Sequence, residues 1–348
     1  MSPYILSTLL FALGLGTLMT FSSSHWLMAW MGLEINTLAI IPLMAQHHHP
    51  RAVEATTKYF LIQAAAAATL LFASVINAWI SGQWEIKNMN HPFTSTIIIM
   101  ALALKLGLAP AHAWLPDVLQ GLNLSTGLIL ATWQKLAPFS LLLQINPSNP
   151  HLLIFLGLAS TLVGGWGGLN QTQLRKILAY SSIAHLGWMV LVIQFSSSIT
   201  LLALLMYLIM TYSIFMIFKL NKSTNMNSLA TTWANAPVLS AMTPLILLSL
   251  GGLPPLSGFL PKWMIIQELS SQNMALMATM AALSALLSLY FYLRLSYAMT
   301  LTLAPNNTTG IFTWRFSPTN ITMPLALTSS ATMCLLPLSP AILALMTT

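Results

Sequence analysis

Long runs of apolar residues, separated by short polar segments, follow one another along almost the whole chain. A helix needs about 20 apolar residues to cross the hydrocarbon core of a bilayer. On that measure the pattern predicts eleven transmembrane helices, over residues 3–21, 25–45, 58–80, 95–120, 123–145, 151–170, 174–195, 198–220, 237–269, 274–298 and 321–347. The fold class that follows is an all-α polytopic membrane protein.

The composition supports a membrane location and excludes other classes. Of the 348 residues, 57% are hydrophobic and 5% are charged, with a mean hydropathy of +0.79. Soluble domains carry about 25% charged residues, so an ordinary soluble fold is excluded. The formal net charge is +7, but the basic residues stand singly within apolar sequence. Without a basic patch interleaved with aromatic residues, nucleic acid is excluded as a partner, and the lipid bilayer is expected instead.

Two of the predicted helices are interrupted by the same motif. Residues 106–117 read LGLAPAHAWLPD, and residues 251–262 read GGLPPLSGFLPK. The aligned motifs share Gly107/Gly252, Leu108/Leu253, Pro110/Pro255, Leu115/Leu260 and Pro116/Pro261. Proline removes a backbone donor and clashes with the preceding turn, so we expect helix breaks at Gly107 and Pro110 and again at Gly252 and Pro255.

The positions of these breaks predict an internal symmetry. The two broken helices, about 95–120 and 237–269, are five helices apart in the predicted order, so they cross the membrane in opposite directions. This predicts two inverted repeats within a single transmembrane domain over residues 1–348. In transporters with such repeats, matched broken helices point to the ion pathway.

The distribution of basic residues predicts the orientation. With the N-terminus inside, the inside loops and adjoining helix ends hold Arg51, Lys58, Arg175, Lys176, Lys219, Lys222, Arg294 and Arg315. The outside holds Lys87. Since inside loops carry the excess of Lys and Arg, we expect the N-terminus inside and the C-terminus outside.

Four charged residues fall within the predicted spans: Glu34, Lys105, Lys135 and Lys262. A charge at the bilayer centre costs roughly 2.5–3.5 kcal/mol on insertion scales, so such residues are candidates for function. Desolvation favours the neutral form of a buried lysine and a nearby carboxylate favours the charged form, which suits proton transfer. The alternative is that Glu34 and one lysine form a buried pair that only fixes helix packing.

His112, inside the first break, and His185 are possible proton relays, because imidazole can transfer protons in a wet channel. Each is equally well explained as a packed, hydrogen-bonding side chain. The tract His47–His49 resembles a metal site but lacks a second ligand cluster, so no metal is expected. One cysteine, Cys334, cannot build a cysteine-based zinc site or an iron–sulfur cluster, and no Walker A motif is present.

Glu34, Lys105 with the motif after it, Lys135, and the motif ending at Lys262 together resemble the antiporter-like subunits of respiratory NADH:ubiquinone oxidoreductase, complex I. The resemblance runs from end to end. In that family a mid-membrane glutamate pairs with the lysine before the first break. A second lysine and a charged residue at the second broken helix continue a hydrated axis. The resemblance therefore implies that these four residues carry protons in an antiporter-like domain.

The resemblance also implies a setting. NADH, FMN, iron–sulfur clusters and ubiquinone are expected in partner subunits and none in this chain. The expected partners are other membrane-arm subunits of complex I, including neighbouring antiporter-like subunits. The expected location is the mitochondrial inner membrane, with the N-terminus in the matrix and the C-terminus toward the intermembrane space. The chain is similar to an animal form of the family that lacks the first three helices, and Lys262 stands where some relatives have glutamate.

Three functions are compatible with the sequence. The leading one is proton translocation from matrix to intermembrane space, driven by NADH oxidation and ubiquinone reduction in partner subunits. The second is a free-standing monovalent cation/proton antiporter, which the repeats suggest. Sodium needs oxygen ligands, however, and Glu34 is the one clear central carboxylate. The third is a structural membrane-arm subunit without its own conduction.

Overall fold

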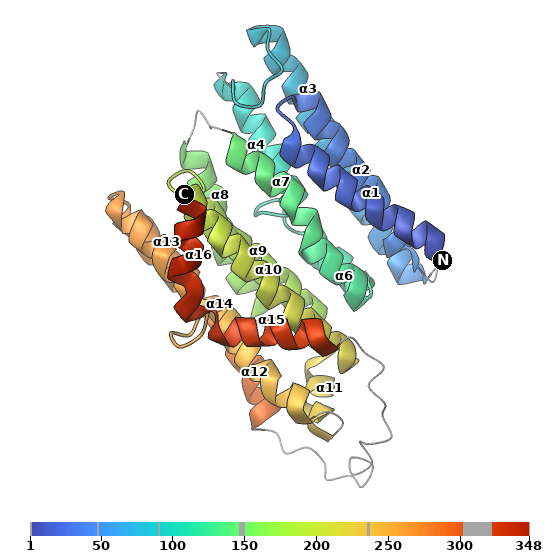
Figure 1. The fold of residues 1–348 in the computed structure, drawn as a ribbon, viewed down its shortest axis with the longest axis vertical. Helices are drawn as coiled ribbons and strands as arrows, with labels where there is room; N and C mark the ends of the chain where they lie inside the picture. The colour runs from blue at the N-terminus through green and yellow to red at the C-terminus, as the bar shows by residue number, and fades with distance from the viewer. Residues whose placement is uncertain are drawn as a thin grey trace. The chain divides into compact units, whose positions relative to one another are not determined.

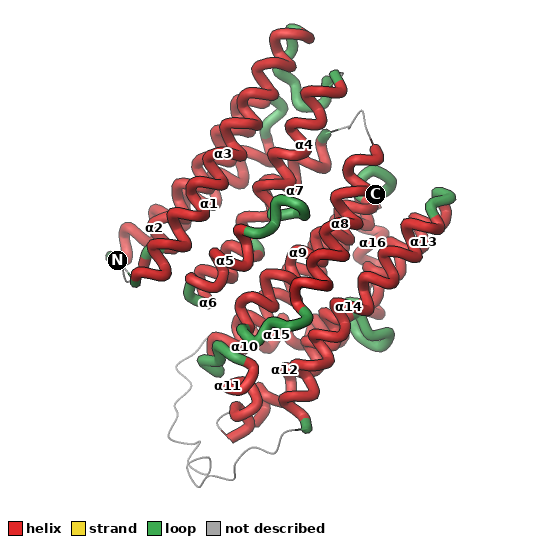
Figure 2. The backbone as a smooth tube through the Cα atoms, turned by 180° about the vertical axis from the view of Figure 1, so that it is seen from behind, coloured by secondary structure: helices red, strands yellow, loops and turns green. Residues whose placement is uncertain are grey.

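The computed structural model describes residues 2–46, 49–89, 91–145, 150–234, 237–301 and 322–347. Within these residues the regular secondary structure is helical (Figure 2), apart from two isolated β-bridges, His25–Glu85 and Gln173–Asn225. The chain forms two compact units, Met1–Ser160 and Thr161–Thr348. Helices suit a bilayer, because a helix satisfies its backbone hydrogen bonds within one segment.

The first unit is built on a layer of long helices that lie side by side (Figure 1). Its elements are α1 (Pro3–Ser22), α2 (Trp26–Met44), α3 (Pro50–Ser81), α4 (Pro92–Leu106), α5 (Trp114–Gly121), α6 (Leu124–Ala131), α7 (Trp133–Gln144) and the first part of α8 (Pro150–Gly168). The backbones of α1 and α2 approach closely at Gly16 and Gly32. A Cβ on either glycine would lie 2.8 Å from the carbonyl oxygen of the other. Small residues allow such close packing in membranes.

The second unit contains the second helix break. Its elements are the remainder of α8, α9 (Leu174–Val192), α10 (Ser197–Leu220), α11 (Met226–Ala230), η2 (Thr231–Ala234), α12 (Pro237–Gly251), α13 (Phe259–Ser271), α14 (Ala275–Thr300), α15 (Thr322–Cys334), η4 (Leu336–Leu338) and α16 (Ser339–Thr347). Helix α12 packs on α14, and α13 packs on α9, α10 and α14. Arg294 of α14 donates to the carbonyls of Leu169 (2.5 Å) and Gln171, which follow the end of α8.

Each predicted span overlaps one helix or two or more consecutive helices, although α3 begins at Pro50, before the predicted start at residue 58. In the described part of the chain, α1, α2, α3, α8, α10 and α14 are long and apolar enough to cross a membrane. The bent pair α15 and α16 makes a seventh if it counts as one span. The helices that precede the two breaks are shorter: α4 and α12 have 15 residues each. The described residues therefore form an all-helical fold in which several helices are long and apolar enough to cross a membrane.

Two predicted helices are divided where the sequence pattern gave no break. The predicted helix 123–145 separates into α6 and α7 at Thr132, whose hydroxyl donates to the carbonyl of Leu128 at 2.7 Å. A hydroxyl bonded back to the preceding turn often bends a helix. The predicted helix 321–347 bends by 72° between α15 and α16. There, Pro337 and Pro340 lack the N–H groups that would continue the helix.

Candidate functional site

The first helix break is held by side chains from neighbouring helices. Helix α4 ends with carbonyls that have no partner inside the helix. Gly107 follows with φ +76°, a left-handed conformation that glycine adopts without steric cost. The indole of Trp114 donates to the carbonyl of Leu104 at 3.1 Å, and the amide of Gln63 donates to the carbonyl of Lys105 at 3.4 Å. Side chains of α3 and α5 thus bond carbonyls at the end of α4, beside the backbone N–H of Gly107, which also donates to the carbonyl of Leu104.

Lys105 lies in the last turn of α4 and is 6% exposed. Among the described residues its Nζ has no hydrogen-bond partner and forms no ion pair, although the charge of Glu34 acts on it electrostatically. The carboxylate of Glu34, on α2, instead accepts a hydrogen bond from the hydroxyl of Thr37 at 2.9 Å. The two groups therefore interact electrostatically without a direct hydrogen bond.

Lys105 and Lys135 line one cavity of about 20 Å³ inside the first unit. A cavity holds a water molecule once it offers about 10–15 Å³ to the centre of a water-sized probe and has polar partners, so this one has room for about one water. The polar part of its lining also includes Asn36, Thr37, Tyr59, Gln63 and Gln134. Thr37 is the residue that bonds Glu34. The cavity thereby connects the surroundings of the carboxylate with both lysines.

Lys135 lies in the first turn of α7 and is 4% exposed. Its backbone N–H donates to the carbonyl of Thr132 at 3.3 Å, across the junction of α6 and α7. The side chain of the preceding residue, Gln134, donates to the carbonyl of Asn36 at 3.2 Å. This bond joins α7 to α2, the helix that carries Glu34. The break at Thr132 and the bond from Gln134 to α2 thus position Lys135 at the start of α7.

The second break, in the second unit, places its lysine differently. Helix α12 ends at Gly251, and Gly252 follows with φ +82°. Lys262, from the first turn of α13, reaches back and donates from Nζ to the carbonyl of Gly251 at 2.7 Å. The side chain also lines a cavity of about 10 Å³ together with His185. This lysine therefore caps the end of the helix before its own break.

The two candidate histidines have different surroundings in the structure. His185 packs against Tyr207 with ring centroids 5.8 Å apart and shares the cavity of Lys262. His112 contacts the carbonyl of Pro110 through Nδ1 at 3.2 Å, and within the described chain it is not part of the lining around Lys105 and Lys135. Of these two histidines, His185 shares a cavity lining with a candidate lysine.

Several polar residues of the cavity in the first unit were missed from the sequence: Asn36, Tyr59, Gln63 and Gln134. Gln63 stands in the apolar run Phe60-Leu-Ile-Gln-Ala, where a polar side chain is conspicuous. That interruption could have identified it. Tyr59 gave no such signal, because tyrosine is common near membrane interfaces. His47, His48 and Arg315 lie outside the described residues.

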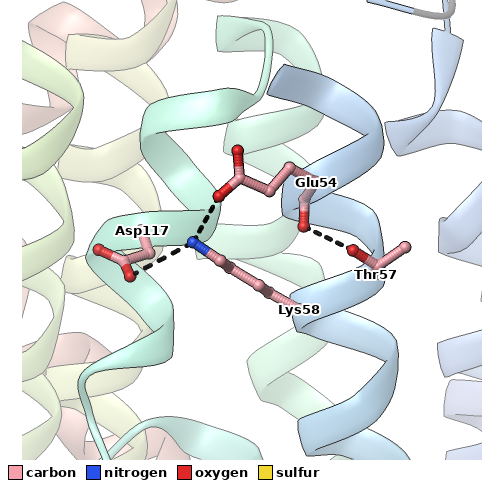
Figure 3. A network of polar contacts seen from close by, with 4 residues as sticks. All are labelled: Glu54, Thr57, Lys58 and Asp117. Atoms are coloured by element: carbon pink, nitrogen blue, oxygen red, sulfur yellow. Dashed lines mark hydrogen bonds and ion pairs between the residues drawn. The ribbon is translucent and has the colours of Figure 1, made fainter. Parts of the chain in front are cut away.

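The charged residues near the start of α3 form a separate network at the surface (Figure 3). Lys58 Nζ lies 2.7 Å from Glu54 Oε1 and 3.9 Å from Asp117 Oδ2, so it links α3 to α5. The three side chains are about half exposed. Exposed ion pairs contribute little to stability. None of these three residues is part of the lining of the cavity that contains Lys105 and Lys135.

Comparison with known proteins identifies the family. The model described as NADH:quinone oxidoreductase/Mrp antiporter, TM matches residues 23–288, and the model for the NADH dehydrogenase subunit 2 C-terminus matches 289–343. NADH-ubiquinone oxidoreductase chain 2 of Tetraodon nigroviridis is 69% identical over 345 residues, which is 99% of each chain. The protein of the same name from Salmo salar is 65% identical over the whole of both chains.

Solved structures agree with this. A chain of respiratory complex I from Thermus thermophilus with bound aureothin is 26% identical, with a TM-score of 0.86 over 99% of this chain and 80% of that one. A chain of the Mrp complex from Dietzia sp. has a TM-score of 0.84 at 16% identity, over 97% of this chain and 76% of that one, and shows a shared fold. The resemblance inferred from the two motifs is thereby confirmed, and the chain belongs to the NADH-ubiquinone oxidoreductase chain 2 family.

Proposed function

We propose that this chain is a core membrane-arm subunit of respiratory NADH:ubiquinone oxidoreductase and takes part in proton translocation from the matrix to the intermembrane space. The proposal rests chiefly on one observation: two buried lysines line the same cavity as the threonine that bonds a mid-helix glutamate. Relatives with nearly two-thirds or more of their residues in common carry the name of this enzyme. NADH oxidation and ubiquinone reduction, with FMN and iron–sulfur clusters, belong to partner subunits.

The proposed mechanism is electrostatic. A carboxylate near Lys105 favours the ammonium form, because opposite charges attract strongly where the dielectric constant is low. A shift of Glu34 away from Lys105 weakens that attraction, and the ammonium releases its proton. Water in the shared cavity passes the proton to Lys135. The added positive charge then favours release of the proton held by Lys262, since like charges repel.

The topology belongs to the same proposal. We expect eleven crossings, with the two broken helices related as inverted repeats within one antiporter-like transmembrane domain over residues 1–348. The N-terminus then faces the matrix and the C-terminus the intermembrane space, in line with the basic residues expected on the inside. The partners are other membrane-arm subunits, including neighbouring antiporter-like subunits.

Membership in the enzyme is tested by gentle solubilisation of the source membrane and separation on a native gel. We expect mass spectrometry to find this chain in the band that carries NADH:quinone reductase activity. Migration apart from that activity would favour a free-standing cation/proton antiporter, and sodium-dependent transport by the isolated chain would then support that alternative.

The proton role is tested with Glu34→Gln in the assembled enzyme. Glutamine keeps an acceptor for the Thr37 hydroxyl and has nearly the same volume, so the change removes charge with little effect on packing. We expect fewer protons pumped per NADH at unchanged assembly. The matched control is Glu54→Gln, at an exposed glutamate of α3, which should leave the ratio unchanged. An equal ratio in both variants would refute the role of Glu34.

A further inference from the structure

The ammonium of Lys262 occupies a defined place at the end of α12. Its Nζ donates to the carbonyl of Gly251, the last residue of that helix, at 2.7 Å. The carbonyls at a helix C-terminus carry partial negative charge, so a cation is favoured there. A bond from an ionised donor is also stronger than one from a neutral donor. The hydrogen bond to the Gly251 carbonyl is therefore stronger for the protonated lysine than for the neutral one.

The space that the Lys262 side chain occupies exists because residue 252 is glycine. A Cβ built on Gly252 would lie 2.9 Å from Cδ, 3.0 Å from Nζ and 3.2 Å from Cε of Lys262. Non-bonded carbon atoms prefer separations of about 3.5–4.0 Å. Three successive atoms of the lysine thus lie closer than a normal contact distance to the place that a Cβ on residue 252 would occupy.

The first break shows that this is not a general feature of the motif. Gly107 has nearly the same backbone conformation, with φ +76° against +82° for Gly252. A Cβ there would meet Leu115 at 3.0 Å and Trp114 at 3.4 Å, and no lysine atom is among its three nearest contacts. Both breaks need glycine for the left-handed turn, but only Gly252 also seats the side chain of a candidate proton carrier.

We infer that Gly252 is a positioning residue for proton transfer, because it seats the Lys262 ammonium against the terminal carbonyl of α12. This inference rests on the proposed function of Lys262. The hydrogen bond to the carbonyl of Gly251 holds the protonated lysine in one place, and loss of the proton weakens this bond. Gly252 thereby determines where Lys262 gives up its proton.

An alanine at position 252 should displace the lysine without preventing folding. The clash falls on the outer half of a long, flexible side chain, which can rotate away. The backbone strain of alanine at a positive φ is the remaining cost, and it can be matched elsewhere. Gly82, at the end of α3, has φ +70° with no atom within 4 Å of its would-be Cβ. Gly82→Ala therefore imposes the same kind of strain and touches no lysine.

The test measures protons pumped per NADH by the assembled enzyme in proteoliposomes, for Gly252→Ala, Lys262→Met, the double variant and Gly82→Ala. We expect Gly252→Ala to lower the ratio to the level of Lys262→Met and the double variant to lower it no further. Gly82→Ala should pump as many protons per NADH as the unaltered enzyme. A purely structural role for Gly252 would instead reduce the amount of assembled enzyme and leave the ratio of the assembled fraction intact.

The inference is overturned if Gly252→Ala pumps as well as Gly82→Ala, or if the double variant pumps less than Lys262→Met. If Lys262→Met pumps fully, the proton role of Lys262 fails, and the inference fails with it. If Gly252→Ala does not assemble, a density map of the unaltered enzyme decides. Density for the Lys262 side chain at the Gly251 carbonyl supports the inferred position of the ammonium, and density directed elsewhere contradicts it.

Discussion

Replacement of Lys105 by methionine separates proton transfer from a purely structural role. Methionine has a similar length and no charge. The ammonium is buried and, among the described residues, has no hydrogen-bond partner. Its removal therefore leaves no other buried donor or acceptor without a partner. Glu34 keeps its bond from Thr37. We therefore expect normal assembly and fewer protons pumped per NADH.

The size of the stability change follows from two opposing contributions. Two charges 4 Å apart attract by about 4 kcal/mol at an effective dielectric constant of 20, which bounds the attraction lost with Lys105. Burial of an ammonium costs several kcal/mol, and this penalty disappears with the charge. The two effects offset, and we expect the free energy of unfolding to change by less than about 2 kcal/mol. A tightly bonded structural pair would lose about 3–5 kcal/mol when one partner is removed.

The assay compares three readouts in one preparation: the amount of assembled enzyme on a native gel, its thermal inactivation midpoint, and protons per NADH in proteoliposomes. Lys219→Met, at an exposed lysine in the last turn of α10, is the control for general effects of the substitution. Full pumping by a fully assembled Lys105→Met enzyme would refute the reasoning. Poor assembly with a normal ratio in the assembled fraction would support the structural alternative.

Three further substitutions test other parts of the structure. Lys135→Met should lower protons per NADH as Lys105→Met does, and a normal ratio would remove Lys135 from the proposed path. Gly258→Ala should cost more than about 3 kcal/mol and reduce assembly on native gels, because its Cβ would lie 1.8 Å from the carbonyl oxygen of Ser249. Gly14→Ala, with nothing within 4 Å, should assemble normally, and equal assembly of the two would contradict the packing argument. Arg294→Met should lower the thermal midpoint, because it removes charge-assisted hydrogen bonds to the carbonyls of Leu169 and Gln171 that contribute about 1.5–3 kcal/mol each. Retention of the midpoint would show that water replaces the guanidinium.

Some features could be predicted from the sequence because a bilayer restricts the length and the polarity of each segment that crosses it. Apolar runs of membrane-crossing length locate the helices, and glycine and proline within such a run mark its interruption. A charge inside the run is costly enough to indicate function, which is how Glu34, Lys105, Lys135 and Lys262 were selected. The family resemblance rested on the same residues. These are local properties, so no knowledge of packing was needed to find them.

Other features depended on how helices distant in the sequence pack together. The sequence could not show that Gln63 of α3 bonds the end of α4, or that residues of α2, α3 and α7 enclose one cavity with two lysines. Nor could it show that Lys262 bonds a helix end while Lys105, in the described chain, has no such bond. A hydrogen bond requires two atoms within about 3 Å, and that distance depends on helix spacing and side-chain rotamers. The sequence determined which groups carry charge into the membrane, and the tertiary structure decided which of them meet, because only folding fixes the distances between them.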